Sequence, residues 1–171
     1  WVVKPASRGS SVGVSIAKSL PELEQAIRHA FSFDKNILVE EYVKGREVTC
    51  GVLENFQGER HHVLHPIEII PPEGRFFDYE VKYNGSTKEV PAPFFGEMLR
   101  TINQTAIAAH ALLGCRHYSR TDMIMKGTKL YVLEINTLPG LTKESLFPKA
   151  ASWAKLEFPQ LLDHLVRLAV S

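Results

Sequence analysis

The spacing of hydrophobic residues in the first part of the chain predicts a short strand followed by a helix. Residues 1–4 are mostly apolar and are expected to form a buried strand, and the polar residues 5–13 a loop. Ser19 with Glu22 three residues later matches a capping box, which marks a helix start. Apolar residues then recur at helical spacing: Leu23, Ile27 and Ala30.

Three apolar runs follow, and they predict strands at 37–43, 47–53 and 62–70. Because short polar stretches separate them, we expect an antiparallel β-meander. The next segment, 71–96, is rich in Pro, Gly and Phe and has no sustained periodicity. A loop of that length inside a compact domain is uncommon and is often an active-site lid, which is our interpretation here.

The second half of the chain predicts a helix, a hairpin and two further helices. The first helix is indicated by apolar residues three and four apart: Leu99, Ile102, Ala106, Ala109 and Leu113. The hairpin joins strands 118–126 and 130–136, and a short helix is expected near 145–153. A final amphipathic helix carries Leu162, Leu165 and Ala169. The predicted class is α+β with mainly antiparallel sheet.

Composition and charge narrow the class of protein. The 171 residues carry 20 Lys and Arg against 19 Asp and Glu, and 44% are hydrophobic, which excludes a disordered chain. The formal net charge of +1 gives no reason to expect a nucleic-acid or membrane partner. The longest apolar stretch, near 106–113, is interrupted by His110 and is shorter than the ~18 residues of a membrane span. Cys50 and Cys115 match no disulfide framework and favour a reduced, cytoplasmic protein.

The hairpin is the first place where chemistry is predicted. If residues 127–129 form a three-residue turn, Asp122 lies opposite Glu134 and Arg120 opposite Asn136, all on one face. Apolar residues then occupy the other face: Met123, Met125, Tyr131, Leu133 and Ile135. The polar face would also carry Ile124, Leu130 and Val132, so that it would be partly buried.

Two carboxylates and an amide oxygen that converge from neighbouring strands suit Mg²⁺. The alternative is a solvated face with cross-strand ion pairs. Because paired carboxylates on a partly buried face need a cation, the metal site is favoured.

Other candidates are weaker taken singly. The loop after Lys4 contains Ser10 between two glycines and is suited to cradle phosphate, although an ordinary polar turn is the alternative. Lys82 in the expected lid can reach a nucleotide phosphate when the lid closes. The alternative is an ordinary solvent-exposed lysine. Glu40 and Glu41 end a predicted strand, at a place suited to flank a flat apolar ligand. A solvated strand end is the alternative.

Three histidines close in sequence suggest a metal site, but strand alternation argues against it. His61 and His65 share one face of the predicted strand, and His62 takes the other. We therefore do not expect metal binding by this group.

Five motifs, taken in order, resemble those of the D-alanine–D-alanine ligase family of the ATP-grasp superfamily. They are KPASRGSSVG, VEEYVKGREVTCGV, DYEVKY, GCRHYSRTDM and LEINTLPGLTKESLFPKAA. The resemblance extends over essentially all 171 residues. It implies an ATP-grasp fold with the nucleotide between two mainly antiparallel α+β subdomains. Residues 1–45 would be the remainder of the central subdomain, and 46–171 the C-terminal subdomain with a lid at about 71–96.

The resemblance also implies that the chain is the C-terminal two-thirds or so of such an enzyme. The sequence begins at Trp1 without Met, and the family's N-terminal Rossmann-like domain is absent from it. We therefore expect the chain alone to bind ATP weakly and not to turn over. By the same resemblance, the whole protein would be a cytoplasmic homodimer.

The implied reaction is ATP-dependent formation of D-alanyl phosphate, followed by attack of a second D-alanine to give the dipeptide for peptidoglycan. The implied nucleotide-binding residues are Lys4, Glu40, Glu41, Val43, Glu47, Phe76, Lys82 and Leu133. The implied ligands of Mg²⁺ (or Mn²⁺) are Asp122, Glu134 and Asn136. The implied catalytic and substrate residues are Ser10, Lys82, Tyr83, Arg120, Gly140, Ser145 and Leu146.

Two positions depart from the common family pattern, and two alternatives remain. Arg8 stands where an acidic residue is frequent, and His117 where glycine is frequent. Tyr83 matches the residue found at this position in ligases that make D-alanyl-D-alanine. The first alternative function is ligation to another acceptor, such as D-lactate or D-serine. A non-catalytic ATP-binding module is the second, against which the intact set of predicted site residues argues.

Overall fold

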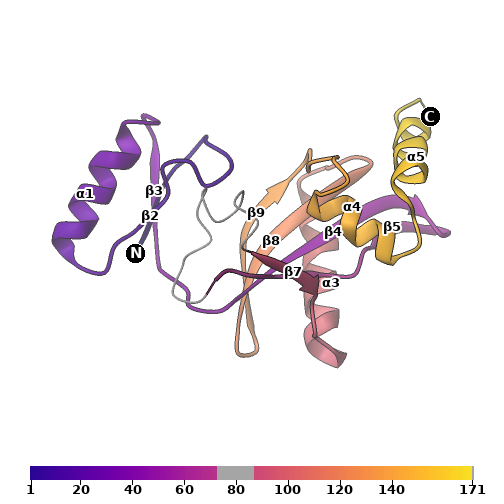
Figure 1. The fold of residues 1–171 in the computed structure, drawn as a ribbon, viewed down its shortest axis with the longest axis horizontal. Coiled ribbons are helices and arrows are strands. Elements are labelled where there is room, and N and C mark those ends of the chain that lie inside the picture. Colours follow the sequence, from indigo (N-terminus) through magenta and orange to yellow (C-terminus); the bar gives the residue numbers. More distant parts are fainter. Residues whose placement is uncertain (73–86, 171) are drawn as a thin grey trace. The chain divides into compact units, whose positions relative to one another are not determined.

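The computed structural model describes residues 1–72 and 87–170. The chain divides into two units, Trp1–Lys44 with Pro71–Lys88, and Gly45–Ile70 with Glu89–Ser171 (Figure 1). Each unit has its own buried apolar core.

Among its described residues, the first unit has a three-stranded antiparallel sheet with helix α1 (Leu20–Phe31) packed on it. β1 (Val2–Pro5) lies between β2 (Ser15–Ile16) and β3 (Ile37–Glu40). Val3 of β1 packs against Ala26 and Ala30 of helix α1 in a buried cluster. Every residue of β1 pairs with a residue of β3, from Val2 opposite Glu40 to Pro5 opposite Ile37. The two strands therefore begin and end at the same level.

Helix α1 begins where the sequence predicts. Ser19 is the N-cap, and its hydroxyl accepts a hydrogen bond from the backbone N–H of Glu22 at 3.4 Å. The Glu22 carboxylate in turn accepts from the backbone N–H of Lys18 at 2.7 Å. These bonds satisfy N–H groups that a helix start otherwise leaves without a partner. The predicted strand 37–43 is shorter than expected, because β3 ends at Glu40.

The second unit is built on a six-stranded sheet around the long strand β4. Its strands are β4 (Arg46–Phe56), β5 (Glu59–Val63), β6 (Ile67–Ile70), β7 (Lys88–Pro91), β8 (Tyr118–Lys126) and β9 (Lys129–Asn136). The order is β7-β6-β4-β8-β9, and β5 also pairs with β4. The pairs of β4 with β5, β6 and β8, and of β8 with β9, are all antiparallel, which confirms the predicted class.

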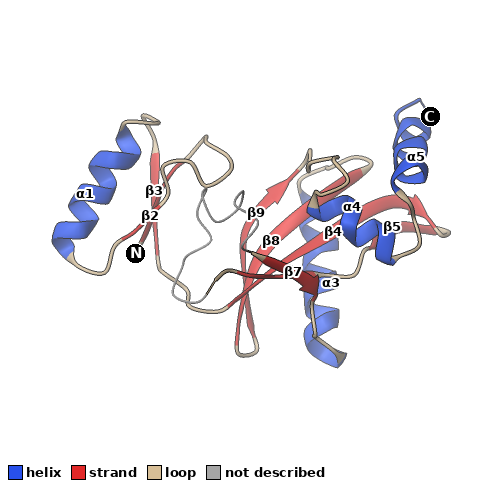
Figure 2. Ribbon diagram, viewed as in Figure 1, coloured by secondary structure: helices blue, strands red, loops and turns tan. Residues whose placement is uncertain are grey.

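Helices pack on both faces of this sheet (Figure 2). Helix α3 (Gly96–Leu112) packs over Val48 and Val52 of β4. Helices α4 (Leu146–Trp153) and α5 (Phe158–Val170) pack over Leu53, on the opposite face because side chains alternate along a strand. The remainder of that second face carries polar side chains, and it is where the candidate site lies.

Four predictions of local structure are wrong. The three strands expected to form one meander are divided between two sheets, because β3 pairs with β1 and not with β4. The single strand expected at 62–70 is divided into β5 and β6, because Pro66 between them has no N–H to donate. The segment expected to be a loop, 71–96, contains β7. The last helix buries Leu161 and Leu165, whereas Leu162 is 36% exposed.

Both cysteines are free thiols. Cys50 is buried in the core under α3, and burial raises the pKa of its thiol to about 12. None of the helices in the described part of the chain combines the length and apolar character that crossing a membrane requires.

Candidate functional site

Strands β8 and β9 place four polar residues opposite one another. Asp122 lies opposite Glu134, and Arg120 lies opposite Asn136. The predicted pairing is therefore confirmed. Because residues opposite each other in an antiparallel pair share a face, the four side chains gather on one side of the hairpin.

The route to this register differs from the prediction. Lys126 pairs with Lys129, so the turn has two residues rather than three. A β-bulge then restores the register, because Leu133 is an extra residue at the step between Met123 and Asp122. The turn is one residue shorter than predicted, and the bulge adds one residue to β9. The two shifts offset each other, so that the polar residues pair as predicted.

The bulge also changes which apolar residues lie beside the polar group. Leu130 and Val132 were expected on the polar face, but they lie opposite Met125 and Met123, and Leu130 packs on the core under α3. Tyr131, expected on the core face, lies opposite Ile124 instead. A one-residue shift moves every side chain of a strand to the other face, which is why the predicted faces fail before the bulge and hold after it.

Asp122 is at the centre of the polar face. Its carboxylate accepts two hydrogen bonds from Arg120, from Nε at 2.9 Å and from Nη2 at 2.8 Å. Asn136 Nδ2 donates to it at 3.0 Å, and the hydroxyl of Thr49 on β4 donates at 2.6 Å. Asp122 is only 8% exposed, and this set of donors keeps a buried carboxylate satisfied.

The charges around Arg120 hold it in its protonated form. Burial lowers the pKa of Arg120, but the hydrogen bonds and charge of Asp122, with the charges of Glu134 and Glu47, outweigh burial and raise it. The side chain is 16% exposed. A cation is therefore fixed on this face among three carboxylates.

The donor set on this face fits a hard divalent cation. Asp122 and Glu134 are opposite each other, and Asn136 donates through Nδ2 to Asp122, so its Oδ1 is directed away from that contact. Carboxylate and amide oxygens at neighbouring strand positions are the ligands that Mg²⁺ takes in proteins. Glu134 is exposed, so the group is open to solvent on that side.

The loop before α4 carries the three residues that the family resemblance implies for a second substrate, Gly140, Ser145 and Leu146. Ser145 is the N-cap of α4, and Leu146 is the first residue of the helix. The Ser145 hydroxyl accepts a hydrogen bond from the backbone N–H of Thr142 at 3.2 Å. It is also hydrogen-bonded to the Thr142 hydroxyl at 2.8 Å. A Cβ on Gly140 would lie 2.8 Å from the Ser145 hydroxyl, so a larger residue there would force the Ser145 side chain to rotate.

In the first unit, Lys4 and Glu40 form an ion pair. Lys4 Nζ lies 2.7 Å from Glu40 Oε2, and the two side chains come from the neighbouring strands β1 and β3. Glu41 and Val43 follow β3, the former exposed and the latter half-buried. A partly exposed ion pair of this kind contributes little to stability.

The loop after β1 has a strained backbone and a defined anchor. Ser10 and Ser11 have φ of 55° and 58°, in the left-handed region that non-glycine residues rarely adopt. Asp34 anchors the start of the loop by accepting hydrogen bonds from the backbone N–H of Ser7, at 2.8 Å, and from its hydroxyl. Strain of this kind is frequent at ligand-binding loops.

The remaining predicted residues have separate locations. Glu47 lies on β4 opposite Ile124, on the polar face, and Leu133 is the bulge residue, 38% exposed. Phe76, Lys82 and Tyr83 lie outside the described residues.

Two residues of the site were not predicted from sequence. Thr49 is the hydrogen-bond donor to Asp122 from β4, and it lies directly opposite Asp122 in the register. A threonine within a run of apolar strand residues was the available signal. Asp34 was missed because its role depends on a contact with Ser7, 27 residues away.

Comparison with known families gives a match over nearly the whole chain. A family model described as the D-ala D-ala ligase C-terminus matches residues 1–167. A protein of Syntrophobacter fumaroxidans named D-alanine–D-alanine ligase is 44% identical over 172 residues, covering 99% of this chain and 54% of that protein. The chain thus spans about half the length of the curated relatives it matches.

Solved structures give the same result for the fold. The chain is similar to the crystal structure of a D-alanine–D-alanine ligase from Bacillus anthracis complexed with ATP, with a TM-score of 0.82 and 33% identity over 99% of this chain and 52% of that one. It is also similar to the VanG D-Ala:D-Ser ligase of Enterococcus faecalis, with a TM-score of 0.84 and 36% identity over 98% of this chain and 48% of that one.

Proposed function

The chain belongs to the D-alanine–D-alanine ligase family, and from that premise we propose that its protein joins two D-alanines in an ATP-dependent reaction through D-alanyl phosphate. The observation that carries the proposal is the polar face of β8 and β9, where Arg120, Asp122, Glu134 and Asn136 converge. The product would serve peptidoglycan synthesis, in the cytoplasm.

Asp122, Glu134 and Asn136 would hold Mg²⁺ or Mn²⁺. When bound, the ion would neutralise phosphate charge and orient the transferred phosphoryl group. Thr49 and Arg120 would keep the carboxylate of Asp122 in place for that ion, because they already donate hydrogen bonds to it.

Arg120 would stabilise negative charge on the reacting carboxyl group. Its guanidinium stays protonated among acidic neighbours and is largely shielded from water, where electrostatic interactions are stronger. The same group would stabilise the oxyanion that forms when the amine of the second D-alanine attacks. Removing one such donor typically costs about 3 kcal/mol of transition-state stabilisation.

The first unit would contribute to nucleotide binding. Lys4 would contact phosphates, exchanging its ion pair with Glu40 for the more highly charged ligand. Ser10 lies in the strained loop that would close over the phosphates. The family resemblance assigns the remaining nucleotide and lid roles to Glu40, Glu41, Val43, Glu47, Leu133, Phe76, Lys82 and Tyr83.

Gly140, Ser145 and Leu146 would form the site of the second substrate. Their loop is held by the contacts of the Ser145 hydroxyl with Thr142, so the acceptor would meet a defined surface. A second candidate function is ligation to D-serine, which is supported by the similarity to a D-Ala:D-Ser ligase. We propose that the complete protein acts as a homodimer.

A chimeric enzyme tests the reaction. This chain replaces the matching 54% of the Syntrophobacter fumaroxidans ligase, and ADP release is measured with D-alanine alone and with D-alanine in competition with D-serine or D-lactate. The proposal expects D-alanine-dependent ADP release and D-alanyl-D-alanine as the main product. A folded chimera that binds ATP but releases no ADP would overturn it and would favour a non-catalytic nucleotide-binding module. A main product containing D-serine would overturn the acceptor alone.

A further inference from the structure

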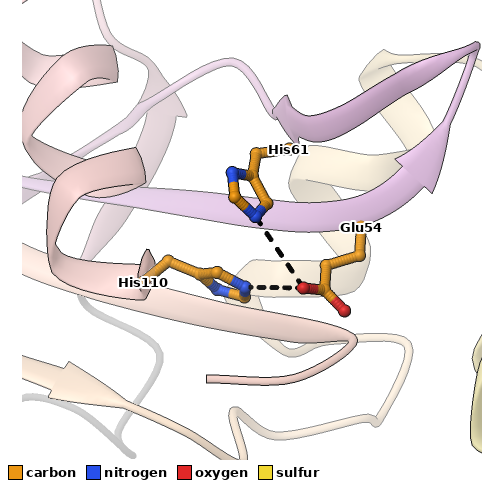
Figure 3. Close-up of side chains that lie close together, drawn as sticks. All are labelled: Glu54, His61 and His110. Carbon is orange, nitrogen blue, oxygen red and sulfur yellow. Dashed lines mark hydrogen bonds and ion pairs between the residues drawn. The ribbon is translucent and has the colours of Figure 1, made fainter. Parts of the chain in front are cut away.

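A second cluster of metal-ligand side chains lies in the second unit, away from the polar face of β8 and β9. Glu54 on β4, His61 on β5 and His110 on α3 each direct one ligand atom to a common point, with these atoms within 4.8 Å of one another (Figure 3). The residues come from three different elements, which is why strand alternation among neighbouring histidines did not predict the group. No role in the proposed ligation reaction involves them.

The ligand atoms are joined by one long hydrogen bond, between His110 and Glu54, and their separations are close to those between the ligands of one metal ion. Glu54 Oε1 lies 3.4 Å from His110 Nε2 and 3.8 Å from His61 Nε2. Both exceed the usual N–H···O distance of about 2.9–3.0 Å. Two ligands bound at about 2.0–2.1 Å from a tetrahedral Zn²⁺ lie about 3.3–3.4 Å apart, so small side-chain rotations would complete the geometry.

The surroundings orient the ligand atoms. His110 is buried, and its Nδ1 is hydrogen-bonded to the hydroxyl of Ser119 at 2.8 Å, which leaves Nε2 directed to Glu54. The backbone N–H of His117 donates to the other oxygen of Glu54 at 2.7 Å. Metal-binding histidines and carboxylates are commonly held by outer partners in this way.

The cluster is also accessible. The side chains of Glu54 and His61 are 21% and 20% exposed, whereas that of His110 is 1% exposed. A site with two partly exposed ligands allows an ion to enter and leaves a coordination position for water.

The cluster is separate from the candidate magnesium site. Thr49, which contacts Asp122, and Glu54 are five residues apart on β4, roughly 17 Å along a strand, and their side chains point to opposite faces. The donor sets differ as well, because two imidazoles and one carboxylate suit a transition metal, whereas oxygen ligands alone suit Mg²⁺.

We propose that Glu54, His61 and His110 bind a divalent transition-metal ion, for which Zn²⁺ is the best match. The ion would join β4, β5 and the end of α3. Because α3 leads directly into β8, the strand that carries Arg120, the ion would stabilise the support of the candidate active site.

Zinc binding by the purified chain tests the proposal. The chain is stripped of metal, and Zn²⁺ is titrated in competition with a chromophoric chelator, with thermal unfolding followed in parallel. We expect one bound ion per chain at micromolar concentration or tighter, and a rise in Tm of about 5–10 °C at a Zn²⁺ concentration about 100-fold above Kd. Co²⁺ substitution should give the visible absorption of a nitrogen and oxygen site, without the thiolate charge-transfer band that binding to Cys115 would produce.

Variants locate the ion. Glu54→Gln and His61→Gln should each weaken Zn²⁺ binding by about 100-fold or more, and Ser119→Ala by about 10–100-fold. The matched control is His62→Gln, because His62 is the next residue on β5 and its Nδ1 contacts Glu59 instead, at 2.8 Å. If Glu54→Gln does not fold, because it also loses the bond that Glu54 accepts from the backbone N–H of His117, His61→Gln decides. Absence of stoichiometric binding by the wild-type chain, or equal affinity in His61→Gln and His62→Gln, would overturn the proposal without affecting the proposed ligase reaction.

Discussion

Arg120 and Asp122 are joined by two parallel hydrogen bonds between residues two positions apart on the same strand, at 2.9 and 2.8 Å. Side chains two apart on a strand share a face, and the planar guanidinium matches the two carboxylate oxygens. The pair lies on a mostly buried face, so Asp122 supplies the charge that keeps Arg120 protonated, and Arg120 fixes the orientation of the proposed metal ligand.

Replacing Arg120 with Lys should therefore impair catalysis more than folding. Lysine keeps the positive charge but cannot form the two parallel hydrogen bonds. We expect kcat of the chimeric enzyme to fall about 10²–10³-fold. Arg100→Lys is the control, because Arg100 is exposed on α3. Equal kcat values for the two variants would contradict the proposed role of Arg120.

Thr49 is expected to stabilise the second unit through its bond to Asp122. Thr49→Val keeps the shape but removes the 2.6 Å hydrogen bond to a buried carboxylate. Hydrogen bonds to charged groups contribute about 1.5–3 kcal/mol, so the free energy of unfolding of this unit should fall by about that amount in urea. Thr49→Ser retains the hydroxyl and should lose less than half as much. A Thr49→Val variant as stable as wild type would show that Arg120 and Asn136 suffice.

Gly140→Ala tests the proposed acceptor site. The added Cβ would lie 2.8 Å from the Ser145 hydroxyl, which must rotate away and lose its contacts with Thr142. We expect KM for the second D-alanine to rise severalfold in the chimera, with a small change in stability. The double variant Gly140→Ala/Ser145→Ala removes the clash, so its effect on stability should be smaller than the sum of the single effects. Simple additivity would indicate that the two residues do not interact.

The hairpin shows how far a sequence pattern can be trusted. The pairs at Asp122 and Arg120 were predicted from an assumed three-residue turn, and they hold because the shorter turn and the inserted residue offset each other. The turn and the bulge at Leu133 were not predictable, since a single inserted residue leaves no periodic signal. The predicted faces of Leu130 and Val132 failed for that reason.

Contacts between elements far apart in the sequence were the other feature that the sequence alone could not predict. Helix α1 follows from local capping by Ser19, and the sequence predicts it. The site made by Glu54, His61 and His110 depends on how α3 packs against β4 and β5, which no local pattern encodes. His117 lies between these cases. Its φ of 69° lies in the left-handed region that favours glycine, so a glycine would adopt this backbone conformation more readily than His117 does.

Gly51 should be intolerant of a larger residue. A Cβ there would lie 2.9 Å from the ring of Phe147 and 3.1 Å from Leu64, in the core that joins α4 to β4. Overpacking a close-packed core typically costs about 1–3 kcal/mol, so Gly51→Ala should lower the free energy of unfolding of the second unit by about that amount, seen as a lower urea midpoint. Gly9→Ala is the control for stability, since a Cβ at Gly9 meets no atom within 4 Å. Equal midpoints for Gly51→Ala and Gly9→Ala would contradict this prediction. They would mean that α4 can move away from β4 without loss of stability.

Asp34 should make the first unit sensitive to acid. Hydrogen bonds from the Ser7 hydroxyl, and from the backbone N–H groups of Asn36 and Ser7, lower the pKa of its carboxyl from 3.8 to about 2. Because the folded pKa is below the unfolded one, the stabilisation by Asp34 is complete above about pH 4 and is lost as the pH falls toward 2. An NMR titration of the side-chain carboxyl carbon should give a midpoint near 2 in the folded chain. Ser7→Ala removes the first of these donors and should raise the midpoint toward 3.8, whereas Ser32→Ala, whose hydroxyl bonds to the carbonyl of His29, should not. A midpoint near 3.8 in the wild-type chain would show that Asp34 does not hold the start of the loop that contains Ser10.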